Sequence, residues 1–171
     1  YKTLPEIQAV SADGRYWVGY SKNNDGLHYT LVWEDGVLAK QLPMPDKNFV
    51  GEDFWYGILG RGISADGSVI YGTTWENWDF GMVYWDEAGE VHYVGEDVRY
   101  CRPVERPDGH GGTFTYNLCD GMWTTATNTN VSPNGKYIAG TYRIESLSAD
   151  GFEKNERNYP AFYNTETQKT V

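Results

Sequence analysis

Three stretches of this sequence share one pattern: VSADGRYWVG at residues 10–19, ISADGSVIYG at 63–72 and VSPNGKYIAG at 131–140. In each, Asp or Asn can bond its own backbone two residues on, and the Gly that follows accepts the positive φ of a tight turn. Strand-forming residues flank the turn, and a second Gly five residues later indicates a bulge or a backbone passing close by. The pattern therefore predicts two strands joined by a tight turn, three times over.

A second block follows in each unit: LVWE at residues 31–34, VYWD at 83–86 and AFYN at 161–164. Each block ends in a turn, and a further short strand follows the first two turns. Each unit is thus predicted as four antiparallel strands in chain order. The repeated serines lie 53 and 68 residues apart, which is longer than the roughly 40 to 50 residues of a propeller blade. We expect the surplus to form loops.

These motifs resemble the bacterial HAF-type repeat and, more loosely, the TolB-type propeller repeat. The resemblance implies an exported bacterial protein with a radial array of four-stranded blades. We predict an all-β, propeller-like array of three four-stranded antiparallel blades in an incomplete ring. The boundaries we expect are residues 1–5 as the last strand of a preceding blade, 7–42 as the first blade, 43–60 as an insert, 61–95 as the second blade, 96–127 as an insert and 128–171 as the third blade.

Composition agrees with a β-rich globular domain. The 171 residues include 20 Gly, 7 Pro and 14 Tyr, and 40% are hydrophobic, which excludes an intrinsically disordered chain. The net charge of -10 would repel a phosphate backbone, so we expect no nucleic acid partner. No apolar run reaches the roughly 18 to 20 residues that span a bilayer, so we expect no membrane span.

Three blades are fewer than the four to eight of known propellers, so each end of the array would expose an apolar face. Two explanations stay open. Two copies associate as a six-bladed ring, with residues 1–5 of one copy pairing with the third blade of the other. Alternatively, the chain is a piece of a longer array, from which missing blades or an export signal have been removed.

The longest connections are predicted at one end of the blades, where loops 21–29, 74–81 and 142–159 join the two inserts. Loops on a rigid scaffold often bind ligands. Tryptophan rings stack on sugars and carboxylates accept bonds from hydroxyls, although loop aromatics also pack loops onto the scaffold. The candidate ligand-binding residues are Glu52, Asp53, Trp55, Trp75, Glu76, Trp78, Asp79 and His110.

The function that we predict is a non-enzymatic binding or scaffolding module of an exported protein, with a glycan or a protein as ligand. One alternative is a carbohydrate-active hydrolase or lyase that uses Asp53 or Asp79, and another is a protein-protein interaction scaffold. The sequence has none of the common catalytic motifs, and we expect no metal and no cofactor. His28 and His92 are predicted as solvated side chains.

Both cysteines, Cys101 and Cys119, fall within the second insert. An even number of cysteines in one insert of an exported protein favours a disulfide that closes the loop. Two free buried thiols are the alternative.

Overall fold

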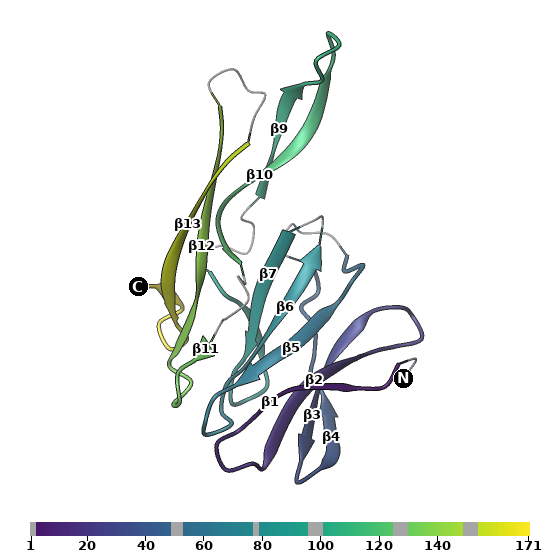
Figure 1. Cartoon of the computed structure of the whole chain (residues 1–171), viewed down its shortest axis with the longest axis vertical. Coiled ribbons are helices and arrows are strands. Elements are labelled where there is room, and N and C mark those ends of the chain that lie inside the picture. The colour runs from purple at the N-terminus through teal and green to yellow at the C-terminus, as the bar shows by residue number, and fades with distance from the viewer. Residues whose placement is uncertain (1–2, 49–52, 77–78, 96–100, 125–129, 149–153) are drawn as a thin grey trace.

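The computed structural model describes residues 3–48, 53–76, 79–95, 101–124, 130–148 and 154–171 (Figure 1). Their regular structure is entirely β, and no helix capable of crossing a membrane occurs among them. The strands are β1 (Glu6–Val10), β2 (Tyr16–Lys22), β3 (His28–Glu34), β4 (Val37–Gln41), β5 (Ile58–Ile63), β6 (Ile70–Glu76), β7 (Asp79–Trp85), β8 (Val91–Tyr93), β9 (Cys101–Pro107), β10 (Thr113–Thr124), β11 (Asn130–Val131), β12 (Tyr137–Leu147), β13 (Lys154–Asn164) and β14 (Lys169–Thr170).

The strands form three antiparallel sheets. The first blade has the order β1-β2-β3-β4 and the second has the order β5-β6-β7-β8. Both are meanders in chain order, as the repeat predicts. The third blade is larger than the four strands predicted, because its sheet has the order β14-β13-β12-β10-β9 and β11 also pairs with β12.

The second blade lies between the other two (Figure 1). Successive residues of a strand point to opposite faces, so Ile70 and Trp85 pack toward the first blade while Tyr71 and Tyr84 pack toward the third. Both faces of this sheet are therefore buried. This explains why its strands read as continuous apolar runs, VIY at residues 69–71 and MVYW at 82–85, instead of alternating with polar residues.

The prediction of long loops at 96–127 and 142–159 is wrong, because strands occupy most of both segments. β12 and β13 are eleven residues each and pair in register from Tyr137 and Asn164 to Leu147 and Lys154. These strands are longer than those of the other blades. The free edge of β12 pairs with one end of β10, and the other end of β10 pairs with β9. Much of the second insert is thus a hairpin that widens the third blade.

Close packing requires glycine at two positions, Gly60 between the first two blades and Gly19 within the first blade. A Cβ on Gly60 of β5 would lie 2.6 Å from the Gly19 carbonyl oxygen of the first blade and 2.5 Å from Thr30 Cγ2. Gly19 itself faces a bulge in β1 between Ile7 and Ala9. The predicted role of the second repeat glycine is confirmed at this position.

Candidate functional site

The repeated serine organises each predicted turn. In the second blade, the buried Ser64 hydroxyl donates to Asp66 Oδ1 over 2.6 Å and accepts the Val69 amide over 2.9 Å. The Gly67 amide also donates to the Ser64 carbonyl. The same bonds recur in the first blade with Ser11, Asp13 and Tyr16, and in the third blade with Ser132, Asn134 and Tyr137. The motif therefore builds the fold and is not by itself a ligand site.

Neighbouring turns also bond to each other. The Ala12 amide donates to the Ala65 carbonyl over 3.1 Å, and the Asp66 amide donates to the Pro133 carbonyl over 3.3 Å. We call this row of bonds the turn ladder. It joins the three blades at the end of the molecule where the tight turns lie.

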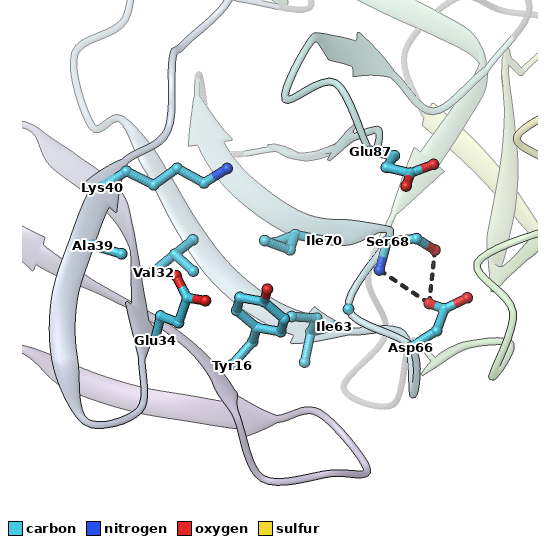
Figure 2. A pocket seen from close by; sticks show the side chains of 11 residues that line it. Tyr16, Val32, Glu34, Ala39, Lys40, Ile63, Asp66, Ser68, Ile70 and Glu87 are labelled. Atoms are coloured by element: carbon cyan, nitrogen blue, oxygen red, sulfur yellow. Dashed lines mark hydrogen bonds between the residues drawn. The ribbon is translucent and has the colours of Figure 1, made fainter.

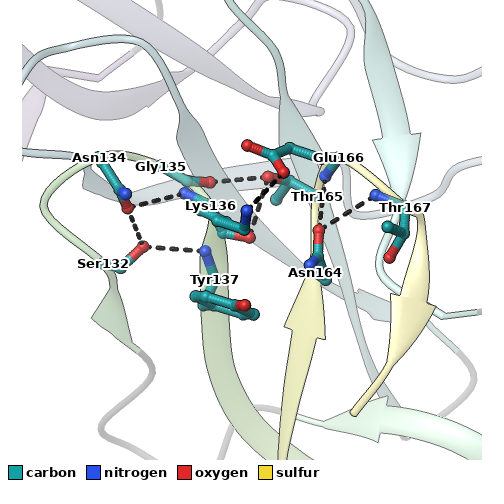
Figure 3. A network of polar contacts seen from close by, with 9 residues as sticks. All are labelled: Ser132, Asn134, Gly135, Lys136, Tyr137, Asn164, Thr165, Glu166 and Thr167. Carbon is teal, nitrogen blue, oxygen red and sulfur yellow. Dashed lines mark hydrogen bonds and ion pairs between the residues drawn. The ribbon is translucent and has the colours of Figure 1, made fainter.

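A polar network fixes this end of the third blade (Figure 3). The Thr165 hydroxyl donates to the Gly135 carbonyl over 2.8 Å, and Lys136 Nζ lies 2.7 Å from Glu166 Oε2. The Asn164 side-chain oxygen accepts the amides of the next turn, from Glu166 and Thr167. The two tight turns of the blade are thus held together.

A cleft of about 360 Å³ opens between the first and second blades at the same end (Figure 2). Its lining includes the apolar side chains of Val32, Ile63 and Ile70. Lys40 and Glu87 lie on opposite sides of it (Figure 2). The candidate residues predicted from sequence belong to loops at the opposite end of the blades. This cleft arises from packing between blades, for which the sequence carries no local signal.

Charges around the cleft favour a polar ligand. Glu34 forms an ion pair with Arg15. The Ser64 hydroxyl, opposed in part by desolvation, holds the pKa of Asp66 below its usual value, together with bonds from Ser68. Asp66 is therefore an ionised acceptor. Carboxylates on the rim accept bonds from hydroxyl or ammonium groups, and the one lysine donates to hydroxyl oxygens.

The predicted ligand-binding residues divide into two groups. Asp53, Trp55 and His110 lie among the described residues. At the tip of the β6–β7 hairpin, Glu76 and Asp79 are register partners, but their side chains lie outside the described part of the structure. The same holds for Trp75, and Glu52 and Trp78 fall wholly outside it.

The first insert is fixed by an internal ion pair and by the second blade, beside its described candidates. Lys47 Nζ lies 2.6 Å from Asp53 Oδ1 and lowers the pKa of that carboxyl. Trp55 is 57% exposed. Trp85 Nε1 donates to the Pro43 carbonyl over 2.7 Å, so an indole of the second blade fixes the start of the insert.

The prediction that His28 and His92 are solvated side chains is wrong. The His28 amide donates to the Tyr56 carbonyl over 2.9 Å, and its ring lies 4.6 Å from the Tyr56 ring. His92 Nε2 lies 2.8 Å from Asp86 Oδ2. Both residues are half-buried. Sequence reasoning missed these contacts because His28 meets the insert only through tertiary packing and His92 meets Asp86 across a turn.

His110 lies at the exposed tip of the β9–β10 hairpin. Asp108 Oδ1 accepts the amides of His110 and Gly112 over 2.7 Å and 2.8 Å, which lowers the pKa of Asp108. Asp108 thus closes the turn and leaves His110 exposed. In the same hairpin, Cys101 and Cys119 are direct register partners.

Comparisons with known proteins do not assign this chain to a family. No protein-family model matches the chain, and no curated protein matches it. Among solved structures, it is similar to a putative TolB from Agrobacterium tumefaciens, with 15% sequence identity and a TM-score of 0.37. The match covers 91% of this chain and 66% of that chain. At this level of similarity, the fold rests on the strands and their register alone, and the HAF-type repeat stays a resemblance of motifs.

The turn network predicts the effects of two substitutions. Ser64→Ala leaves the Val69 amide without its acceptor inside the protein, so we expect the free energy of unfolding to fall by about 2 kcal/mol. Asp66→Asn keeps the acceptor oxygen, as Asn134 does in the third blade, and should cost clearly less. Urea unfolding followed by circular dichroism measures both. Equal losses for the two variants would contradict the role given to the serine.

Proposed function

We propose that the chain is a non-catalytic binding and scaffolding module of an exported protein. Its ligand is a further blade of its own repeat type, supplied by a second copy of the chain. The observation that carries the proposal is that side chains covered by a neighbour in the second blade have more exposed equivalents at the two ends of the array.

The first blade has an apolar face with no neighbour among the described residues. In the second blade, Trp85 packs toward the preceding blade and is 1% exposed. The equivalent Trp33 of the first blade lies on the face away from the second blade, next to its register partner Leu38, which is 44% exposed. Val10 and Trp17 pair on the same face, and Val10 is 50% exposed. A preceding blade would cover these side chains.

The third blade has the complementary face. Tyr84 of the second blade packs toward the next blade and is 1% exposed, whereas the equivalent Phe162 of the third blade is 55% exposed. Phe162 pairs with Ala139, and Tyr137, two residues from Ala139, lies on the same face and is 37% exposed. A following blade would cover this surface.

The turn ladder supports a head-to-tail arrangement. Within the chain, the Asp66 amide donates to the Pro133 carbonyl of the next turn. Asn134 is the repeat equivalent of Asp66, and Ala12 is the equivalent of Pro133. In a head-to-tail pair, the Asn134 amide of one copy meets the Ala12 carbonyl of the other. Two copies then give six blades, a number at which propellers close.

A glycan is the second candidate ligand, favoured by one observation. Trp55 is 57% exposed and follows the ionised Asp53 by two residues, and an exposed indole near a carboxylate suits sugar recognition. Glu52, Trp75, Glu76, Trp78, Asp79 and His110 stay predictions as members of this surface.

The opposed cysteines support export. Residues directly opposite in an antiparallel pair have Cα atoms roughly 4.5 to 5.5 Å apart, which suits a disulfide. We propose that Cys101 and Cys119 form this bond. Their two thiols lose two protons and two electrons to a disulfide oxidant of an oxidising compartment.

Association is tested by light scattering after gel filtration. We expect a mass twice the 19.4 kDa of the chain at micromolar concentration. Phe162→Lys and Leu38→Lys, one on each face, should each give a monomer. Phe114→Lys is the matched control, because Phe114 is similarly exposed but lies on the β9–β10 hairpin. A monomeric parent chain, or association that survives both variants, would refute the head-to-tail pair.

Glycan binding is tested on an array of immobilised oligosaccharides. Binding should be lost in Trp55→Ala and kept in Tyr159→Ala, since Tyr159 is exposed on a different blade. A parent chain that binds no sugar on the array would remove this candidate without affecting the association proposal.

The disulfide is tested by mass spectrometry of the chain secreted into an oxidising compartment. Reduction should add the mass of two hydrogens, and Cys101→Ser should lower the free energy of unfolding by about 3 kcal/mol. Labelling of both thiols by an alkylating reagent in the unreduced, unfolded chain would show that the bond does not form.

A further inference from the structure

The turn between β7 and β8 brings three metal-ligating side chains together. Asp86, Glu90 and His92 each offer one ligand atom, and these atoms all lie within 4.8 Å of one another. It is the one such group in the part of the chain that the structure describes. The cluster is separate from the exposed blade faces and from Trp55.

Strand alternation explains why the three side chains share a face. His92 is the register partner of Tyr84, so both point to the same side of the hairpin. Asp86 lies two residues after Tyr84 and Glu90 lies two residues before His92, which places them on that side as well. The backbone bond from the Asp86 amide to the Glu90 carbonyl, 3.1 Å long, closes the hairpin between them.

Packing and hydrogen bonds orient the ligands. The His92 ring stacks on the Tyr84 ring, with centroids 4.9 Å apart and planes at 21°. Tyr84 is itself 1% exposed, so the imidazole rests on a fixed surface. Asp86 Oδ1 accepts the Glu90 amide over 2.9 Å, which leaves Oδ2 directed at His92 Nε2. Supporting contacts of this kind are what hold ligands in metal sites.

The donor set suits a borderline divalent ion. We propose that Asp86, Glu90 and His92 bind Zn²⁺, with water completing the coordination. Zinc binds both imidazole nitrogen and carboxylate oxygen, and three protein ligands with water in the fourth position is the pattern of open zinc sites. Ligand atoms of tetrahedral zinc lie about 3.4 Å apart. Zinc would therefore replace the 2.8 Å hydrogen bond between Asp86 and His92, and no two of the three ligand atoms start more than 4.8 Å apart.

The other two blades lack the equivalent group. The position of Asp86 is Glu34 in the first blade and Asn164 in the third, and neither following strand contains a histidine. The hairpin itself recurs in every blade, so the fold does not require a histidine there. A structural ion pair between Asp86 and His92 is the simpler alternative. The exposed Glu90 side chain distinguishes the two explanations, because zinc binding requires it and the ion pair does not.

The test is isothermal titration of the untagged, chelator-treated chain with ZnCl₂. We expect one ion per chain with a micromolar dissociation constant, and a loss of affinity of about tenfold or more in Glu90→Gln and in His92→Gln. His28→Gln is the matched control, since His28 is a half-buried histidine outside the cluster, and should bind zinc like the parent chain. Circular dichroism confirms that each variant is folded.

Several outcomes would overturn the proposal. One is the absence of a one-to-one binding isotherm up to millimolar zinc. Another is parent-like affinity in the folded Glu90→Gln variant, which would leave only the ion pair. A third is loss of binding in His28→Gln. MgCl₂ replaces ZnCl₂ in a parallel titration and should bind at least about tenfold more weakly, because an imidazole ligand favours zinc over magnesium.

Discussion

The fold depends on a serine hydroxyl that completes each tight turn. The hydroxyl satisfies an amide five residues on and holds the carboxylate or amide side chain two residues on. Because the hydroxyl of Ser64 is buried, the bonds that it makes have no solvent competitor. The turn then sets the register of the two strands that it joins, and the side chains of both strands alternate between the faces that meet the neighbouring blades.

Stacking of blades follows from that register. The second blade buries both faces, whereas the first and third blades each bury one. The turn ladder adds directional bonds to this apolar packing, with an amide at one end and a carbonyl at the other. This polarity is why the proposed association is head-to-tail, with the last blade of one copy against the first blade of the other.

The repeated motif predicted much of this from sequence. The positions of the tight turns, the four-stranded meanders and the close approach at Gly19 all follow from local residue types. The extension of β12 and β13 was missed because NERNYP and TYRIES contain polar residues that resemble a loop. Their strand pairing is set by the neighbouring strand and not by an apolar pattern.

The sites were harder to predict than the fold. The cleft is formed by residues of two blades, and neither contribution is distinctive alone. The sequence did not indicate a role for His92, because Asp86 belongs to a predicted turn and nothing in the pattern pairs the two residues. Sequence reasoning detects chemistry within one motif, and here the chemistry arises where two strands or two blades meet.

Hydrogen exchange of single amides, followed by NMR, tests the turn ladder most directly. The account predicts that the Ala12 and Asp66 amides are protected at every protein concentration, and that the Asn134 amide becomes protected only as the chain associates. Exchange of Ala12 and Asp66 at the rate of the exposed amide of Gly109 would contradict it.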